Sequence, residues 1–121
     1  MNFLRNMFQP GASGTTNADV REIASRSPRR VIDVREPGEF AGELGHIEGA
    51  ELVPLGTLPE AARDWPRDAE LVVVCRSGAR SSRAAQVLKE LGFERVVNMS
   101  GGMIAWNDAG LPVGRAAPRG R

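Results

Sequence analysis

The chain has 121 residues, of which 41% are apolar, with a single cysteine and a formal net charge of +1. This length suits one domain with one core, and the near-neutral charge gives no global field to draw in nucleic acid or an anionic membrane. A lone cysteine cannot form an intramolecular disulfide, and no apolar run approaches the length of a membrane span. We therefore expect a cytoplasmic protein with no membrane and no nucleic-acid partner.

Both ends of the chain differ in composition from its middle. Residues 9–16 are small, polar and glycine-rich, which indicates a linker, so residues 1–15 are expected to form a flexible N-terminal extension. Residues 114–121 are rich in glycine and arginine and are expected to form a disordered basic tail. The folded domain is thus predicted to span residues 16–113.

The first predicted element is a short amphipathic helix at the start of this domain. Thr16 and Asp19 resemble an N-cap pair, and Val20, Ile23 and Ala24 fall on one helical face. Four short apolar segments follow, rich in β-branched residues as buried parallel strands are, at 31–34, 52–55, 71–74 and 96–99.

The clearest helix is predicted between the last two of these strands, from about residue 81 to residue 91. Its apolar residues recur at i, i+3, i+4 and i+7. Gly92 is expected to supply the left-handed position after the helix, with Phe93 packing back on Leu88. Strand, helix and strand then form a βαβ unit with a right-handed crossover. The predicted fold class is α/β, with a mostly parallel central sheet flanked by helices on both faces.

Residues that follow parallel strands collect at one edge of the sheet, where open α/β folds bind ligands. The only cysteine, Cys75, follows the third predicted strand and should lie at this edge, together with Arg35. A cysteine after an apolar strand could also be buried core. The six-residue loop that begins at Cys75 favours a reactive role instead. It leads from a strand into a helix capped by a serine, and this arrangement directs backbone N–H groups and a helix N-terminus at one point.

Such an environment favours the thiolate and lowers the cysteine pKa. Gly78 is expected to take a positive φ, while Arg76 and Arg80 add charge for a dianionic substrate, although each alone could be a solvated surface arginine. Cys75 is therefore the predicted nucleophile, and its substrate is expected to contact the amides and charges of Arg76, Ser77, Gly78, Ala79 and Arg80.

The only histidine, His46, lies between Gly45 and Ile47, and a structural hydrogen-bonding role is the favoured interpretation. A cysteine and histidine dyad is therefore not expected. One histidine and one cysteine also cannot furnish a usual zinc site, so no metal and no cofactor are predicted.

Four stretches of the sequence resemble, in order and spacing, the single-domain rhodanese family. They are residues 32–40, the family's first strand and turn; 45–50, its Gly-His-Ile-Pro-Gly-Ala motif; 75–82, its active-site loop and following helix; and 100–106 with 109–113, its closing segment. The resemblance covers roughly residues 16–113. Glu48 departs from it by standing where the family usually has proline, which should affect loop rigidity more than chemistry.

The resemblance implies a rhodanese-like fold and a sulfurtransferase. Cys75 would attack the outer sulfur of a small donor such as thiosulfate, release sulfite and hold the sulfur as a persulfide; a thiol, a protein sulfur acceptor or cyanide would then take it. Asp33 and Arg35 match positions that the family keeps near its site, and a salt bridge that braces the loop edge is their preferred role.

Three other interpretations compete with sulfur transfer. Phosphatases and arsenate reductases with this fold have five residues between cysteine and arginine, whereas only four separate Cys75 from Arg80, and this shorter ring favours sulfur over phosphate. The fold could also serve as a non-catalytic binding or redox-sensing module. Nucleic-acid binding through the arginines lacks a basic cluster or an aromatic platform.

Overall fold

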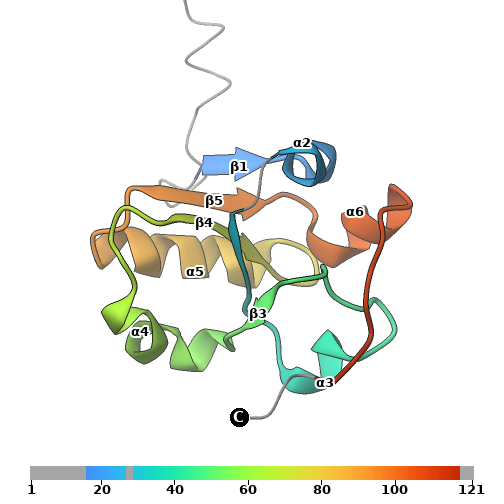
Figure 1. Cartoon of the computed structure of the whole chain (residues 1–121), viewed down its shortest axis with the longest axis horizontal. Helices are drawn as coiled ribbons and strands as arrows, with labels where there is room; N and C mark the ends of the chain where they lie inside the picture. The colour runs from blue at the N-terminus through green and yellow to red at the C-terminus, as the bar shows by residue number, and fades with distance from the viewer. Residues whose placement is uncertain (1–15, 27–28, 118–121) are drawn as a thin grey trace, which may run out of the picture.

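The computed structural model describes residues 16–26 and 29–117, in which a five-stranded sheet carries helices on both faces (Figure 1). The strands are β1 (Thr16–Ala18), β2 (Arg30–Asp33), β3 (Glu51–Leu52), β4 (Glu70–Val74) and β5 (Arg95–Met99). They lie in the order β1-β5-β4-β2-β3, and every neighbouring pair is parallel. The predicted α/β class is confirmed.

The helical segments lie between these strands in chain order, except for the last one, which follows β5. They are α2 (Val20–Ser25), α3 (Pro37–Phe40), η1 (Leu55–Thr57), α4 (Leu58–Ala61), η2 (Ala62–Asp64), α5 (Ala79–Glu90) and α6 (Gly102–Asp108). None of the described helices is long and apolar enough to cross a membrane.

The central strand β4 supplies both cores because successive side chains point to opposite faces. Leu71 and Val73 pack with residues of α4 and α5, whereas Val72 and Val74 pack with residues of α2 and α6. All four side chains are buried. The strand that ends at the cysteine is thus fixed from both sides.

The start of the domain differs from the prediction. Thr16 lies in β1, paired with Val97 of β5, and does not cap a helix. Asp19 alone caps α2, since its side chain accepts a hydrogen bond from the backbone N–H of Arg21 at 2.7 Å. The predicted strand at 52–55 is also displaced: β3 ends at Leu52, and Pro54 precedes the 3₁₀ helix η1, which begins at Leu55.

Helix α5 begins at Ala79, two residues before its predicted start. The residue before it is Gly78, with a φ of +109°, so the helix is not capped by a serine as expected. Its other end agrees with the prediction: Gly92 has a φ of +103°, and the backbone N–H of Phe93 bonds to the carbonyl of Leu88 at 3.1 Å.

The beginning of the expected basic tail is bonded to the domain. Gly114 and His46 exchange two backbone hydrogen bonds, each 2.8 Å long, and the Arg115 side chain donates to the carbonyl of Glu43 at 2.8 Å. These bonds attach residues 114 and 115 to the domain, beyond the boundary predicted at residue 113. The expected extension at residues 1–15 and the last four residues of the expected tail lie outside the described residues.

Candidate active site around Cys75

Cys75 directly follows β4, and only 1% of its surface is exposed. Its Sγ accepts a hydrogen bond from the backbone N–H of Gly78 at 3.0 Å and lies 3.3 Å from the hydroxyl oxygen of Ser81. Burial works to raise the pKa of this thiol. The hydroxyl of Ser81 and the backbone N–H groups of Ser81, Gly78 and Ser77 outweigh burial, so that the pKa of Cys75 lies below its ordinary value.

The first turn of α6 holds the Cys75 loop from behind. The backbone N–H groups of Met103 and Ile104 donate to the carbonyls of Cys75 and Arg76, at 2.9 and 3.1 Å. In a trans peptide the N–H points away from the C=O, so these bonds turn the N–H groups of the next residues away from α6. The loop therefore presents amides, not carbonyls, to the sulfur.

Two glycines permit this close arrangement. Gly78 has a φ of +109°, which side-chain-bearing residues rarely adopt. Gly102 has a φ of +61°, and a Cβ there would overlap the carbonyls of Cys75 and Arg76. Gly78 is thus required by the backbone conformation of the loop and Gly102 by the approach of the loop to α6, and the close approach at Gly102 was not predicted.

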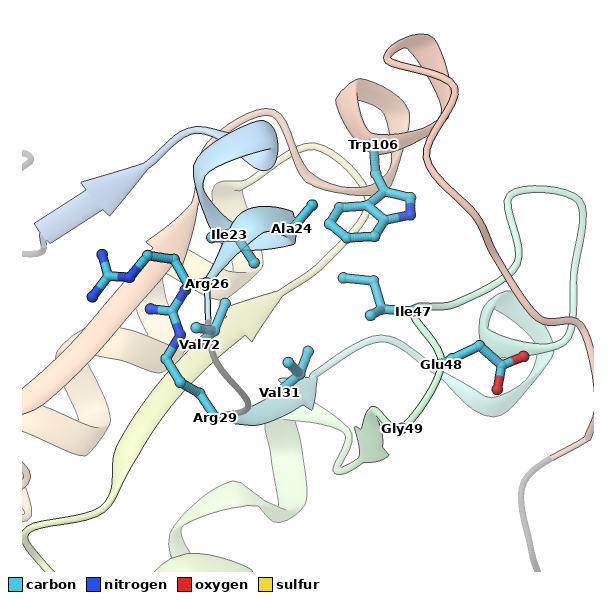
Figure 2. Close-up of a pocket in the computed structure, with 10 residues that line it drawn as sticks. All are labelled: Ile23, Ala24, Arg26, Arg29, Val31, Ile47, Glu48, Gly49, Val72 and Trp106. Carbon is cyan, nitrogen blue, oxygen red and sulfur yellow. The ribbon is translucent and has the colours of Figure 1, made fainter.

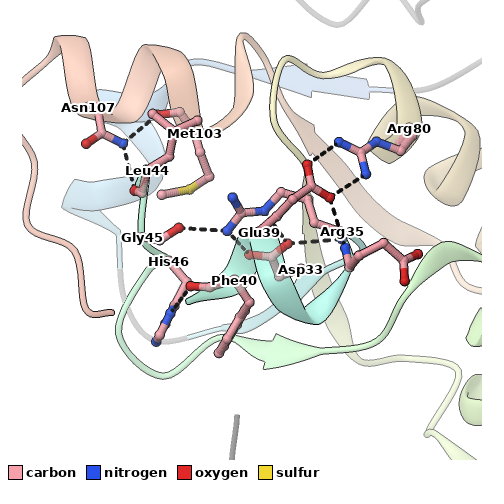
Figure 3. A network of polar contacts seen from close by, with 11 residues as sticks. Asp33, Arg35, Glu39, Phe40, Leu44, Gly45, His46, Arg80, Met103 and Asn107 are labelled. Carbon is pink, nitrogen blue, oxygen red and sulfur yellow. Dashed lines mark hydrogen bonds and ion pairs between the residues drawn. The ribbon is translucent and has the colours of Figure 1, made fainter. Parts of the chain in front are cut away.

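The two loop arginines differ in their surroundings. Arg80 donates from Nη1 and Nη2 to the two carboxylate oxygens of Glu39, at 2.8 and 2.9 Å (Figure 3). This hydrogen bonding is the main cause of the raised pKa of Arg80, and attraction to Cys75 adds to it. Arg76 is exposed and has no side-chain hydrogen bond or ion pair among the described residues.

A cavity of about 250 Å³ opens beside Arg76. Its other lining residues come from the end of β2 and from α3 and the turn that follows it; they are Arg35, Gly38, Glu39, Gly42, Glu43 and Leu44. The cavity adjoins the Cys75 loop through Arg76, so it has the position of a pocket for the part of a substrate that does not react.

Asp33 and Arg35 form a buried ion pair at the end of β2, with 0% and 1% of their surfaces exposed. Arg35 donates from Nε and Nη2 to the Asp33 carboxylate at 2.9 and 2.8 Å, and Nη2 also donates to the carbonyl of Gly45 at 2.7 Å (Figure 3). Both carboxylate oxygens of the pair are therefore bonded to the guanidinium, and the pair joins β2 to the turn that carries Gly45.

His46 has a structural environment in this turn. Its Nδ1 donates to the carbonyl of Phe40 at 2.8 Å, and its ring stacks on the Phe40 ring with the centroids 3.7 Å apart. The side chain is buried, and both of these contacts are with α3 and not with the sulfur. This agrees with a hydrogen-bonding role.

The sequence analysis gave no role to Asn98, a polar residue of the site. Asn98 lies in β5, 5% exposed, and its Oδ1 is 2.5 Å from the hydroxyl oxygen of Ser81. Its Nδ2 donates to Oδ1 of Asn17 at 2.9 Å. The available signal was an amide side chain inside the otherwise apolar segment 96–99, because buried polar groups need partners.

A second cavity, of about 310 Å³, lies on the face of the sheet covered by α2 and α6 (Figure 2). Its lining includes Val72 and Trp106, with Arg26 and Arg29 on one side. None of its described lining residues belongs to the loop from Cys75 to Arg80. This cavity is therefore separate from the Cys75 sulfur, and Trp106 is part of the core, with 4% of its surface exposed.

Comparison with other proteins gives the family. Residues 16–109 match the family model of the rhodanese-like domain. A sulfurtransferase of Allochromatium vinosum is 41% identical over 100 residues, which cover 83% of this chain and 90% of that protein. The thiosulfate sulfurtransferase GlpE of Pseudoalteromonas translucida is 32% identical over 92 residues, covering 76% of this chain and 86% of that protein.

The same domain also occurs in longer proteins, since the match covers only 45% of two other relatives. Among solved structures, a rhodanese-related protein from Thermoplasma volcanium superposes with a TM-score of 0.76 at 30% identity, over 83% of this chain and 98% of that one. The matched region contains β1 to α6 and the whole Cys75 loop. The chain belongs to the rhodanese-like domain family.

Proposed function

We propose that the protein is a sulfurtransferase that carries sulfane sulfur as a persulfide on Cys75. It takes the sulfur from thiosulfate or a persulfide donor and passes it to a thiol, a protein acceptor or cyanide. The observation that carries this proposal is the hydrogen bond from the Gly78 amide to Sγ, inside a loop whose other amides also lower the thiol pKa. The relatives named as sulfurtransferases support it.

The reaction has two displacement steps. The Cys75 thiolate attacks the outer sulfur of thiosulfate, so that a new S–S bond forms at Cys75 while the S–S bond of thiosulfate breaks and sulfite leaves with its electron pair. An acceptor thiolate then attacks the outer sulfur of the persulfide and returns Cys75 to the thiolate. In both states the amides of the loop stabilise negative charge on sulfur.

Substrate binding follows from the same geometry. Arg76 has no partner among the described residues and lies beside a cavity of about 250 Å³, so its guanidinium is available to the oxygens of an anionic donor. The backbone N–H groups of Ser77, Gly78 and Ser81, which lower the pKa of Cys75, bind the reacting sulfur. Arg80, held by Glu39, adds a fixed positive charge near Cys75.

The supporting residues and the compartment complete the proposal. Asp33 and Arg35 keep the end of β2 and the Gly45 turn in place beside the loop. The mechanism needs Cys75 as a free thiol, a state that a reducing compartment such as the cytoplasm maintains. No step requires a metal or an organic cofactor.

Mass spectrometry tests the proposal directly. After incubation with thiosulfate, the wild-type protein should gain the mass of one sulfur atom on the peptide containing Cys75, and addition of cyanide should remove it as thiocyanate. A Cys75→Ser variant should do neither. Hydrolysis of an aryl phosphate without sulfur uptake would overturn the proposal in favour of a phosphatase.

If the folded wild-type protein showed neither sulfur uptake nor aryl phosphate hydrolysis, the result would instead favour the binding or redox-sensing module. The circular dichroism spectrum and thermal midpoint of wild type and the Cys75→Ser variant serve as the control, because serine replaces cysteine with little change in volume. Equal thermal midpoints would exclude unfolding as the reason for a negative result.

A further inference from the structure

A chain of polar side chains runs from Cys75 to the edge of the sheet. The Ser81 hydroxyl oxygen lies 3.3 Å from Sγ and 2.5 Å from Oδ1 of Asn98, whose Nδ2 donates to Oδ1 of Asn17 at 2.9 Å. Ser81 is fully buried on α5, Asn98 is buried on β5, and Asn17 is exposed on the edge strand β1. The chain thus connects the sulfur with solvent through three side chains.

The hydroxyl of Ser81 has one hydrogen and two neighbouring acceptors. The hydroxyl is placed to donate either to Sγ at 3.3 Å or to Oδ1 of Asn98 at 2.5 Å. With its one hydrogen on Oδ1, the shorter contact, Ser81 presents an oxygen lone pair to Sγ. This arrangement suits an uncharged thiol, whose S–H can donate to the serine oxygen. It does not suit a negatively charged sulfur, which needs a donor.

A half-turn of the Asn98 amide removes this conflict. Nδ2 then donates to the oxygen of Ser81, and the serine hydrogen turns to the sulfur. Asn17 is exposed, so its own amide can turn and donate to Oδ1 of Asn98. The half-turn gives up a long bond of 3.4 Å from Nδ2 to the carbonyl of Gly78, which favours the described orientation while the sulfur is uncharged.

We propose that Asn98 and Asn17 are positioning residues that direct the Ser81 hydroxyl hydrogen to Cys75 whenever its sulfur carries negative charge, as thiolate or as persulfide. The persulfide part rests on the proposed function; the thiolate part does not. Asn98 acts through Ser81 and touches no substrate. The amide relay, as we name Asn17, Asn98 and Ser81 together, makes the donor to the sulfur available only in the charged state.

Asn17, on the edge strand β1, can be substituted without disturbing the core, and it therefore offers a test of the relay. Aspartate at position 17 accepts but cannot donate, so Asn17→Asp holds Asn98 with Nδ2 towards residue 17 and keeps the serine hydrogen away from sulfur. We expect Asn17→Asp to raise the apparent thiol pKa and to slow alkylation of Cys75 by iodoacetamide at about pH 7 by roughly three- to tenfold. Asn17→Ala, which imposes no orientation, should not slow it.

A matched background separates the relay from the added charge. In a Ser81→Ala protein the carboxylate introduced by Asn17→Asp keeps its charge but the hydroxyl is absent, so this substitution should slow alkylation far less there than in the wild-type background. The other charged groups near the sulfur are the same in every variant: Arg76 and Arg80 of the loop, Glu39 of α3, and Asp33 and Arg35 at the end of β2. Repeating the measurement at about 1 M salt screens the exposed charge and should leave the relay effect.

Two results would overturn the inference. One is an equal slowing by Asn17→Asp in the two backgrounds, which would show that charge acts through space. The other is that Asn17→Asp does not slow alkylation in either background and that Asn98→Leu, in a folded protein, leaves the pH profile of alkylation unchanged. Alkylation needs no sulfur donor, so failure of the thiosulfate reaction and failure of the relay are distinguishable.

Discussion

Arg80 donates two hydrogen bonds to the carboxylate of Glu39, 2.8 and 2.9 Å long, from a position 41 residues later in the chain. The pair joins the first turn of α5 to α3 (Figure 3). A guanidinium held at two nitrogens has a fixed direction and little freedom to follow a substrate. The pair therefore separates the two loop arginines into one that stabilises the loop and one that is available to a ligand.

The ion pair between Glu39 and Arg80 makes the stability of the fold depend on pH. The Arg80 hydrogen bonds lower the pKa of Glu39 from 4.5 to about 2, against the smaller opposing effect of its partial burial. A lowered pKa contributes stability above pH 4.5, and this contribution is lost as the pH falls through about 2. Between about pH 7 and about pH 3, the thermal midpoint of Glu39→Gln should therefore fall less than that of wild type. A parallel fall in both proteins would contradict this.

Substitution of the two arginines should have different effects. Arg76→Ala removes an exposed guanidinium that has no partner in the described part of the chain, so we expect an unchanged thermal midpoint. The KM for thiosulfate should rise about tenfold, as for the loss of one charge-assisted contact. Arg80→Ala leaves Glu39 without its partner and should lower the thermal midpoint. Steady-state kinetics with calorimetry on both variants measure the contrast, and an unchanged KM in Arg76→Ala would contradict it.

Gly78→Ala should abolish sulfur uptake at a modest cost in stability. Its φ of +109° is strained for alanine, by about 1 to 2 kcal/mol, and a Cβ would lie 3.4 Å from the backbone nitrogen of Gly101. Gly110→Ala is the matched control, because its φ is +73° and a Cβ there meets no atom within 4 Å. Urea unfolding should show comparable losses, while only Gly78→Ala loses the persulfide signal.

Breaking the buried ion pair should be costly. Arg35→Met leaves the Asp33 carboxylate buried without its cation and also removes the bond to Gly45, so we expect a loss of about 3 to 5 kcal/mol in the free energy of unfolding. Arg26→Gln breaks an exposed pair with Glu22 and should cost less than about 1 kcal/mol. Equal losses in urea titrations would contradict the assignment of a bracing role.

The position of Cys75 in the fold could be predicted because its signals are local. The apolar run 71–74 determines a buried strand, the apolar stripe determines α5, and Gly92 ends that helix whatever lies elsewhere in the chain. Parallel topology then places Cys75 at the carboxyl edge of the sheet. These steps need no knowledge of contacts between distant residues.

The rest of the site depends on such contacts and could not be predicted. Asn98 meets Ser81 from another element, 17 positions away, and the serine was expected to cap the helix because serine does so often. Strand β1 has three small or polar residues and no alternation of apolar ones; it forms because β5 offers it an edge. Local patterns do not contain this information.

The contact between α6 and the Cys75 loop has a consequence for the order in which the protein is made. Met103 and Ile104 hold the loop carbonyls, and they leave the ribosome after every strand of the sheet has been synthesised. A nascent chain that ends before them has the cysteine but lacks the bonds that orient its amides. We expect such a chain to carry an ordinary thiol, so that under the proposed function the sulfur becomes reactive only when translation has supplied α6.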